Sequence, residues 1–418
     1  MNTAKLVFND CLDYLKAFAK WIILAVLVGI IGGVIGSIFH NSIDLATEFR
    51  TEHPQILYLL PIGGLVIAGL YHLFKKQGRI DTNRVLDSAG GDEKVPLVMA
   101  PLIFISTVIT HLLGGSAGRE GAALQLGGSI GYNVGKLFRL EKSSSHIIVM
   151  SGMSAVFAAL FGTPLTAAVF ALEVVFVGTI HYAALMPCLI SAITAYRIAL
   201  MFGITPVHFD LTVFGTLTAG IAAKAIVLAL LCAVLSIGFC SAIKLCEKYM
   251  KKYLANRYLR AVVGGVIIVL LTLLVGTYDY NGAGMDVVTR AMNGEVRPEA
   301  FLLKIIFTSI TISAGFKGGE IVPAFFVGST FGCFAGGLLG LDPAIGAAIG
   351  FVALFCGAVN CPLASIMLSL EVFGGESMAV LSIVCAVSYM MSGCFGLYKS
   401  QKIVYSKINE DLINKSTH

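Results

Sequence analysis

Two glycine-rich stretches, each containing a glutamate, interrupt apolar sequence at an offset of 200 residues. Residues 114–121 read GGSAGREG and contain Glu120, and residues 317–323 read KGGEIVP and contain Glu320. A carboxyl group at membrane depth marks an ion pathway or a proton relay. Glycine breaks at matching positions of two halves indicate the binding site of a transporter. The pattern therefore predicts a site for a small charged species inside a membrane.

The glycines suit an anion in particular. A helix that begins inside a membrane leaves its first N–H groups without partners, and an anion can accept from them in the favourable field of the helix dipole. Gly118 and Gly121 precede an apolar run at 122–130, and Pro323 lies in the first turn of a second run at 321–328. We expect a helix to begin at each stretch, with glycine letting the backbone approach the ion.

Glu120 adds proton chemistry to this anion site. Its carboxylate would compete with a bound anion and would leave when protonated. Burial and a neighbouring anion both raise the pKa of a carboxyl group, so one residue could gate the anion path and carry a proton. A structural ion pair with the adjacent Arg119 is the alternative role. Glu173 and Glu371 are expected near helix ends in structural roles.

The elements around these stretches are membrane spans. Hydrophobic residues make up 57% and charged residues 13% of the 418 residues, and the mean hydropathy is +0.87. Soluble domains carry about 25% charged residues. Charge-poor runs of about 20 residues predict helical spans rather than barrel strands. No cleavable signal peptide is expected, because the first apolar run is long enough to span.

Basic residues predict the topology, since short cytoplasmic loops are rich in Lys and Arg. The N-terminus and the tail are expected inside, and an acidic loop near 41–55 and the segment 203–215 outside. Spans are expected near 17–39, 56–74, 218–243 and 261–278. The first repeat would cover residues 1–205, the second, inverted repeat 206–400, and a short cytoplasmic tail 401–418.

Direct comparison of the two halves supports a repeat. Pro164-Leu165 and Pro362-Leu363 lie 198 residues apart, as do Leu172-Glu173 and Leu370-Glu371. Chance agreement of both pairs in one register is improbable, whereas chance identity among apolar residues is common. Two similar halves of opposite orientation form an inverted repeat, with a site expected near the midplane.

These motifs resemble the CLC family of anion channels and proton-coupled anion antiporters. Residues 118–121 match its GREGP element with Ala122 in place of proline, residues 318–323 match GxFxP, and residues 164–173 match PLAG…E. The resemblance runs from about residue 20 to residue 405. It implies an all-α polytopic membrane protein, an inverted-repeat fold with broken helices that meet near the bilayer midplane, and a homodimer with one pore per subunit.

The resemblance also implies roles for individual residues. Glu120 would be the gating, proton-carrying glutamate, with Gly118, Arg119 and Gly121 beside the anion. The backbone N–H groups of Glu320 and Ile321 would contact the central anion. A tyrosine near the C-terminus would cap the inner side, and Tyr398 is the candidate, with Tyr405 as the alternative.

Departures from the chloride-handling members point to the fluoride-exporting branch. The GSGIP element is absent, and the chain reads GRIDTNRV at 78–85 in its place. Residues 114–121 and 316–320 are similar to the fluoride branch, and so is Val174 in place of a second glutamate. That branch carries Thr where Val322 stands and Met in the first loop, and neither is present.

Fluoride is small and strongly hydrated, so its site needs close, strong donors. Asn83 offers an amide and Thr82 a hydroxyl. The positive edges of Phe325 and Phe326, beside the second stretch, could add to them, although lipid- or core-facing rings are the alternative. We expect a fluoride/proton antiporter that exports F⁻ through the plasma membrane. A CLC-type chloride channel or Cl⁻/H⁺ antiporter is the alternative.

Other classes of function fit less well. Residues 114–118 and 127–131 match GxSxG, but a hydrolase needs a strand–turn–helix setting and a placed His and Asp, so no enzymatic activity is expected. Among the ten cysteines no CxxC pair or His/Cys cluster has metal spacing. No cofactor or nucleic acid is expected at a net charge of +5, and a structural cation near Gly318 stays open.

Overall fold

The fold is described by a computed structural model that covers residues 2–74, 76, 78–91, 93–209 and 218–418, with side chains from residue 11 onward except 142 and 143. The predicted outside segment 203–215 therefore lies partly beyond the described residues. The first half contains α1 (Asn2–Glu52), η1 (Pro54–Leu59), α2 (Leu60–Leu73), α3 (Thr82–Gly90), α4 (Met99–Leu112), α5 (Glu120–Leu137), α6 (Lys142–Phe161), α7 (Pro164–Glu173), β1 (Phe176–Val177), η3 (Tyr182–Ala184) and α8 (Leu185–Met201).

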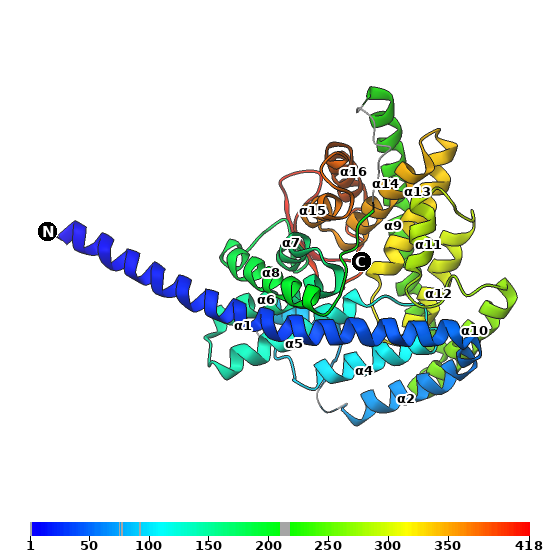
Figure 1. Ribbon diagram of the computed structural model, residues 1–418, viewed down its shortest axis with the longest axis horizontal. Helices are drawn as coiled ribbons and strands as arrows, with labels where there is room; N and C mark the ends of the chain where they lie inside the picture. The colour runs from blue at the N-terminus through cyan, green and yellow to red at the C-terminus, as the bar shows by residue number, and fades with distance from the viewer. Residues whose placement is uncertain (1, 75, 77, 92, 210–217) are drawn as a thin grey trace.

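The second half repeats this order of helices. It contains α9 (Ala219–Tyr253), α10 (Arg257–Val275), α11 (Met285–Met292), α12 (Ala300–Ala314), α13 (Ile321–Leu338), α14 (Pro343–Val359), α15 (Pro362–Phe373) and α16 (Met378–Met391), followed by β2 (Lys402–Tyr405) and β3 (Leu412–Ser416). Helices α7 and α15, which open with the two Pro-Leu pairs, lie side by side (Figure 1).

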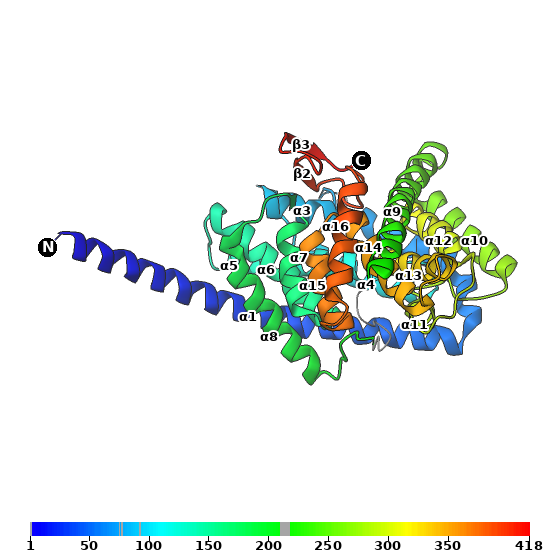
Figure 2. The same ribbon diagram turned by 90° about the horizontal axis from the view of Figure 1, so that it is seen from above.

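The apolar spans are confirmed. Among the described residues, seven helical stretches are long and apolar enough to cross a membrane, including Pro54–Leu73, Ala219–Tyr253 and Arg257–Val275. The predicted loop at 41–55 is wrong, because α1 continues as one helix to Glu52. Its N-terminal part projects beyond the body of the molecule (Figures 1 and 2).

Glycines let paired helices pack with their backbones in contact. In the first half, a Cβ on Gly127 would lie 2.2 Å from the carbonyl oxygen of Gly152, which joins α5 to α6. In the second half, a Cβ on Gly328 would lie 2.2 Å from the carbonyl oxygen of Gly350, which joins α13 to α14. Small residues at such crossings are typical of membrane helices.

The C-terminal tail is not only a polar extension of an all-helical chain. β2 pairs in parallel with β1 and antiparallel with β3, so the tail forms a three-stranded sheet with a two-residue strand that follows α7. Figure 2 places this sheet and α3 at one face of the molecule, and α11 towards the opposite face. The tail is thereby tied to the first half.

Candidate functional site

The two glycine-rich stretches meet in the middle of the fold. Gly118 and Gly319 form an isolated antiparallel bridge, in which each N–H donates to the carbonyl oxygen of the other at 2.7 Å. Helix α5 begins at Glu120 and α13 begins at Ile321. The N-terminal ends of two buried helices therefore converge, as the sequence predicted. Both helix dipoles favour negative charge at this point.

Close backbone approach at the bridge requires glycine. A Cβ on Gly319 would lie 2.4 Å from the backbone nitrogen of Gly121, and one on Gly121 would lie 2.9 Å from the Cα of Gly319. Neither obstacle is a flexible side chain. Any larger residue would push the helix ends apart and change the spacing of their N–H groups.

Glu120 is buried at this junction, with 1% of its surface exposed. Its Oε2 accepts from the backbone N–H of Arg119 at 3.0 Å, and the carboxyl group folds back over Gly118, where a Cβ would lie 2.7 Å from Oε2. Its Oε1 has no hydrogen-bond partner among the described residues. The carboxylate thus takes the kind of backbone interaction that a small anion would take at a helix N-terminus.

Arg119 is held chiefly by α1 rather than by its neighbour. Its Nη1 lies 2.7 Å from Oδ1 of Asp44, whereas its Nε lies 3.9 Å from Oε1 of Glu120. Asp44 also accepts from Nε2 of His40 at 2.9 Å. The ion pair with Arg119, the alternative role for Glu120, is therefore the longer of the two contacts, and Oε1 of Glu120 still lacks a hydrogen-bond partner among the described residues.

A cavity of about 630 Å³ opens beside Glu120 and is called the Glu120 cavity below. The part of α1 that ends at Glu52 lines one side of it, and the segment leading into α11 lines another. Its ionisable lining residues are His40, Asp44, Arg50, His111, Arg119, Glu120, His208, Tyr278, Asp279 and Asp286. Both signs of charge occur, so the cavity is polar without being uniformly cationic.

Glu320 occupies a different position from Glu120. It precedes the first residue of α13 and adopts the N-cap position. A Cβ on Gly121 would lie 3.4 Å from Oε2 of Glu320, so this carboxyl group lies near the first turn of α5. Ile321 is fully buried. The backbone N–H groups of both residues belong to the unpaired first turn of α13.

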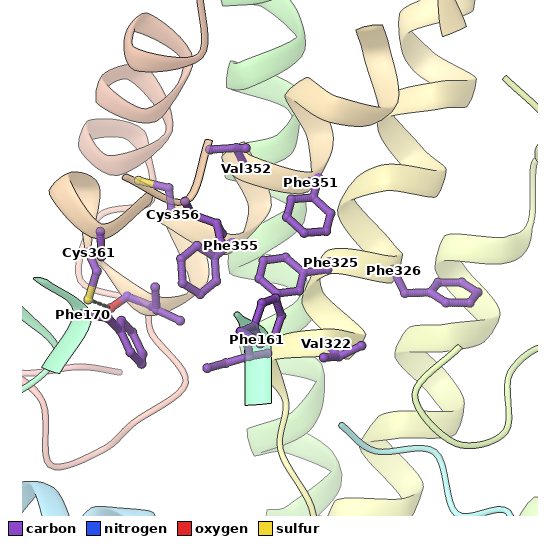
Figure 3. Packing of buried hydrophobic residues seen from close by; sticks show 14 of the residues in the cluster. Phe161, Phe170, Val322, Phe325, Phe326, Phe351, Val352, Phe355, Cys356 and Cys361 are labelled. Carbon is purple, nitrogen blue, oxygen red and sulfur yellow. Dashed lines mark hydrogen bonds between the residues drawn. The ribbon is translucent and has the colours of Figure 1, made fainter. Parts of the chain in front are cut away.

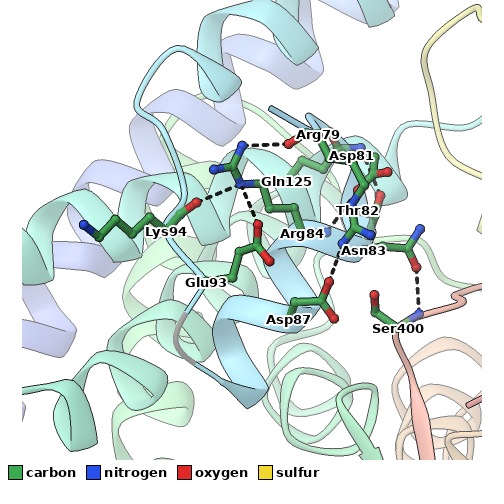
Figure 4. A network of polar contacts seen from close by, with 10 residues as sticks. All are labelled: Arg79, Asp81, Thr82, Asn83, Arg84, Asp87, Glu93, Lys94, Gln125 and Ser400. Carbon is green, nitrogen blue, oxygen red and sulfur yellow. Dashed lines mark hydrogen bonds and ion pairs between the residues drawn. The ribbon is translucent and has the colours of Figure 1, made fainter. Parts of the chain in front are cut away.

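The structure brings Thr82 to the first turn of α5 (Figure 4). Thr82 is buried, its hydroxyl accepts from Nε2 of Gln125 at 2.9 Å, and it lies 3.4 Å from the carbonyl oxygen of Gly121. Asp81 caps the helix that carries Thr82, because its side chain accepts from the backbone N–H of Arg84 at 3.0 Å. The hydroxyl already has protein partners in this state.

Asn83 contacts the C-terminal segment. Its Oδ1 accepts from the backbone N–H of Ser400 at 2.9 Å (Figure 4). Tyr398, two residues earlier, is 2% exposed, and its hydroxyl has no hydrogen-bond partner among the described residues. Tyr405 lies on β2 with 45% of its surface exposed. The placement favours Tyr398 over Tyr405 as the tyrosine of the site.

The two phenylalanines after the second stretch point in different directions (Figure 3). Phe325 stacks on Phe351 with ring centroids 4.0 Å apart, and its ring lies 5.6 Å from that of Phe161 in an edge arrangement. Phe326 packs against Tyr280 and under Nζ of Lys304 at 4.9 Å. Phe161, which lines the Glu120 cavity, was not anticipated from the sequence.

The loop before Glu120 is fixed from two sides. The backbone N–H of Ser116 donates to Oγ1 of Thr311 at 3.1 Å, and the hydroxyls of Ser116 and Thr308 lie 3.0 Å apart. On the other side, Nδ2 of Asn281 donates to the carbonyl oxygen of Gly114 at 2.9 Å. The serine of the first GxSxG match is thus a loop anchor.

The second GxSxG serine, Ser129, lies within α5, and its hydroxyl donates to the carbonyl oxygen of Pro96 at 3.2 Å. Neither serine follows a strand in the described chain, which a nucleophile elbow requires.

Glu173 and Glu371 cap each other's helices across the repeat. Glu173 ends α7 and accepts from the N–H groups of Leu363 and Ala364 at the start of α15, at 3.1 and 2.8 Å. Glu371, in the last turns of α15, accepts from the N–H groups of Leu165 and Thr166 at 2.9 and 2.8 Å and from the Thr166 hydroxyl at 2.6 Å. Glu173 and Glu371 thus have structural roles, in which each caps the helix that carries the other.

Residues 11–74, 76, 78–91, 93–209 and 218–418 contain no cluster of three or more His, Cys, Asp or Glu side chains that could hold a metal ion. A Cβ on Gly318 would meet the Cβ of Ala117 at 2.5 Å and the carbonyl oxygen of Gly118 at 2.9 Å. The absence of such a side-chain cluster does not test whether backbone carbonyl oxygens bind a cation. A structural cation near Gly318 therefore stays a prediction.

Converging buried helix ends, a carboxyl group between them and two repeated halves define a class of membrane transport proteins built on an inverted repeat. A family model described as voltage gated chloride channel matches residues 63–393, which is most of the chain. The chain belongs to this family, the CLC family, and has its fold.

Individual relatives agree with this assignment. The chloride/fluoride channel protein of Pseudomonas syringae pv. tomato is 35% identical over 408 residues, covering 96% of this chain and 90% of that protein. The crystal structure of a CLC-type fluoride/proton antiporter matches with a TM-score of 0.89 and 31% identity, covering 92% of this chain and 98% of that one. The H(+)/Cl(−) exchange transporter ClcA of Vibrio cholerae is 26% identical, covering 87% and 84%.

Proposed function

We propose that the chain is a fluoride/proton antiporter that exports fluoride from the cytoplasm across the plasma membrane. The observation that carries the proposal is the buried Glu120 carboxyl group. It accepts from a backbone N–H at the meeting point of α5 and α13, its other oxygen has no hydrogen-bond partner among the described residues, and the residue lines a cavity. A carboxylate in an anion's place can exchange with the anion, and protonation removes its charge. One group can thereby couple the two ions.

The similarity to a fluoride/proton antiporter supports fluoride as the anion. The site offers backbone N–H groups of Glu320 and Ile321, with Tyr398, Thr82 and Asn83 near the opposite side of the junction. Phe325 can present its ring edge, whereas Phe326 packs against Tyr280. We assign the backbone N–H groups of Glu320 and Ile321, the side chains of Tyr398, Thr82 and Asn83, and the ring of Phe325 to the anion path. Phe326 is assigned a packing role.

The proposed orientation follows from α1. With the N-terminus in the cytoplasm, α1 would carry Asp44 and Arg50 to the outer side, so the Glu120 cavity would open outward. Tyr398, Asn83 and the C-terminal sheet would lie on the cytoplasmic side. We further propose a homodimer with one anion path per subunit, and transport rather than catalysis of a reaction.

Flux from proteoliposomes tests the proposal. Liposomes loaded with fluoride or chloride are opened to ion movement, and anion efflux and proton uptake are recorded together. Fluoride efflux should drive proton uptake, and chloride efflux should be much slower. Glu120→Gln should abolish proton movement, because a side-chain amide has no carboxyl group that can take up and release a proton. Fluoride efflux without proton uptake would contradict antiport.

A chloride channel or Cl⁻/H⁺ antiporter is the second candidate, favoured by the likeness to the Vibrio cholerae exchanger. The same recordings separate the candidates. Equal rates for chloride and fluoride would favour this second function.

A further inference from the structure

His111 is one of the residues that line the Glu120 cavity, and its ring carries a buried hydrogen-bond acceptor that is not used. It lies in the last turn of α4, is 1% exposed, and has Nδ1 3.0 Å from the carbonyl oxygen of Thr107. A carbonyl oxygen only accepts, so Nδ1 must carry the hydrogen, and Nε2 of the neutral ring is then an acceptor. Nε2 has no partner among the described residues, and the ring lines the cavity.

Three cations, Arg50, Arg119 and Lys304, interact electrostatically with the His111 ring. Nη1 of Arg50, from α1, donates to the carbonyl oxygen of His111 at 2.6 Å. Arg119 precedes α5, and Nζ of Lys304, from α12, donates to the carbonyl oxygens of Tyr280 and Gly282 at 3.2 and 2.8 Å. A further positive charge beside them would be repelled, as in any cluster of like charges at low dielectric.

Two of the acidic groups of the cavity have other partners. Asp44 is engaged by His40 and Arg119, and Asp279 lies 2.8 Å from Nη2 of Arg290. The remaining ionisable groups that line the cavity are Asp286 and Tyr278 near α11, and His208.

A buried polar atom without a partner needs an explanation, and Oε1 of Glu120 is a second such atom on the same cavity. A carboxylate and a neutral imidazole nitrogen are both acceptors, so they do not bind each other. A protonated carboxyl group has one O–H donor. The two atoms therefore become complementary only after Glu120 has taken up a proton.

We propose that His111 is a positioning residue that docks protonated Glu120. When the carboxyl group takes up a proton and turns into the cavity, its O–H donates to Nε2 of His111, directly or through one water. The docked state leaves the junction of α5 and α13 to the anion. Loss of the proton removes the donor and returns the carboxylate to the backbone N–H of Arg119. This step rests on the proposed function and adds a specific partner to it.

His40 supplies the natural comparison. It lines the same cavity and its Nδ1 also lacks a partner among the described residues, but its Nε2 lies 2.9 Å from Asp44. The His40 ring is thereby tied to Asp44, whereas Nε2 of His111 has no partner among the described residues. The cationic surroundings of His111 make it the better dock.

Two matched substitutions separate docking from packing. His111→Asn keeps a donor near the position of Nδ1 for the Thr107 carbonyl and loses the acceptor at Nε2. His111→Gln loses that donor and places a carbonyl oxygen near the position of Nε2. Fluoride-driven proton uptake is measured in proteoliposomes across external pH for wild type, both variants and His40→Asn.

The docking role predicts that His111→Asn lowers coupled exchange near neutral external pH by roughly two- to tenfold, the effect of one hydrogen bond. Its pH profile should move to lower pH, because protonated Glu120 has lost a stabilising contact, and His111→Gln should recover most of the loss. A packing role predicts the reverse order. An unchanged profile for His111→Asn, or the shift in His40→Asn instead, would overturn the proposal.

A structure of the Glu120→Gln variant gives an independent test, which holds even if the His111 variants fold poorly. The introduced amide mimics the protonated acid as a donor, so it should lie in the cavity within hydrogen-bond reach of Nε2 of His111 or of a shared water. An amide that stays over Gly118 or points elsewhere would refute the dock. Wild-type liposomes without proton uptake would instead refute the antiport function.

Discussion

The ends of α5 and α13 share a Gly-Glu pattern at an offset of 200 residues but hold their glutamates differently. Glu120 is the first residue of its helix, and its carboxyl group turns back to a backbone N–H and borders a cavity. Glu320 is the N-cap of its helix, and its carboxyl group lies near the first turn of α5. The two glutamates therefore differ by one residue in their position relative to the helix start.

A second pair of glutamates behaves in the opposite way. Glu173 and Glu371 keep the same role in both halves, since each accepts from the first N–H groups of the helix that carries the other. Repeat symmetry is thus kept at the reciprocal caps and lost at the glutamates of the two glycine-rich stretches. The predictions below test this division.

The largest effect is expected at the bridge between the halves. Gly319→Ala should destabilise the protein by about 3 kcal/mol or more, because its Cβ would meet backbone at Gly121. Gly118→Ala should cost only about 1 kcal/mol, since the nearest atom is the Glu120 carboxyl group, which can move. Thermal unfolding in detergent measures both, and equal losses would contradict the asymmetry of the bridge.

The second prediction compares the two glutamates in transport. Glu320→Gln keeps the backbone N–H groups of α13, so proton uptake per fluoride should stay within about twofold of wild type. Glu120→Gln should lower it at least roughly tenfold, because the amide cannot carry the proton. Recordings from the same liposome preparation compare them directly. Loss of coupling in Glu320→Gln would place a proton carrier in the second half as well.

The third prediction concerns the reciprocal caps. Glu371→Ala and Glu173→Ala should each destabilise by roughly 1–3 kcal/mol, because charged hydrogen bonds to helix N–H groups are lost. Glu371→Ala should be the more costly, since it removes three hydrogen bonds rather than two. The Gln variants retain one acceptor oxygen and serve as controls. Alanine variants with wild-type melting temperatures would show that the caps contribute nothing.

The sequence predicted the parts of the fold that depend on local pattern. Glycine, proline and charge at residues 118–121 and 318–323 predicted where α5 and α13 begin, and apolar runs predicted the spans. The loop expected at 41–55 was wrong because Asp44 is paired with His40 and Arg119, which lets α1 continue past its charges. A linear charge pattern does not contain such long-range pairs.

The sequence indicated residue types for the site, but it did not indicate which residues each side chain contacts. Thr82 lies 3.4 Å from Gly121 and Asn83 contacts Ser400, but Phe326 packs away from Phe325, because consecutive helical residues point about 100° apart. His111 and Phe161 carried no sequence signal, since a histidine or phenylalanine in an apolar helix is ordinarily a core residue. The short strand β1 was missed because its partner, β2, lies more than 200 residues later.

The smallest effect is expected where the second half has an anchor that the first half lacks. Helices α6 and α14 both end in a left-handed residue, Gly162 and Asn360. Only Asn360 is bound by a lysine among the described residues. Nζ of Lys407 donates to Oδ1 of Asn360 and, at 2.8 and 2.9 Å, to the carbonyl oxygen of Tyr389 and the Ser392 hydroxyl.

Burial lowers the pKa of Lys407 from 10.5 to about 8. Between these values the unfolded chain binds more protons than the folded protein, so stability should rise with pH through this window. The gain should be about 1 kcal/mol, since solvent reaches part of the side chain. Lys407→Met lacks this group, so the melting temperature of wild type minus that of the variant should increase from pH 8 to 10. Other groups that titrate there cancel in the difference, and parallel curves would mean that Lys407 is solvated in the folded protein.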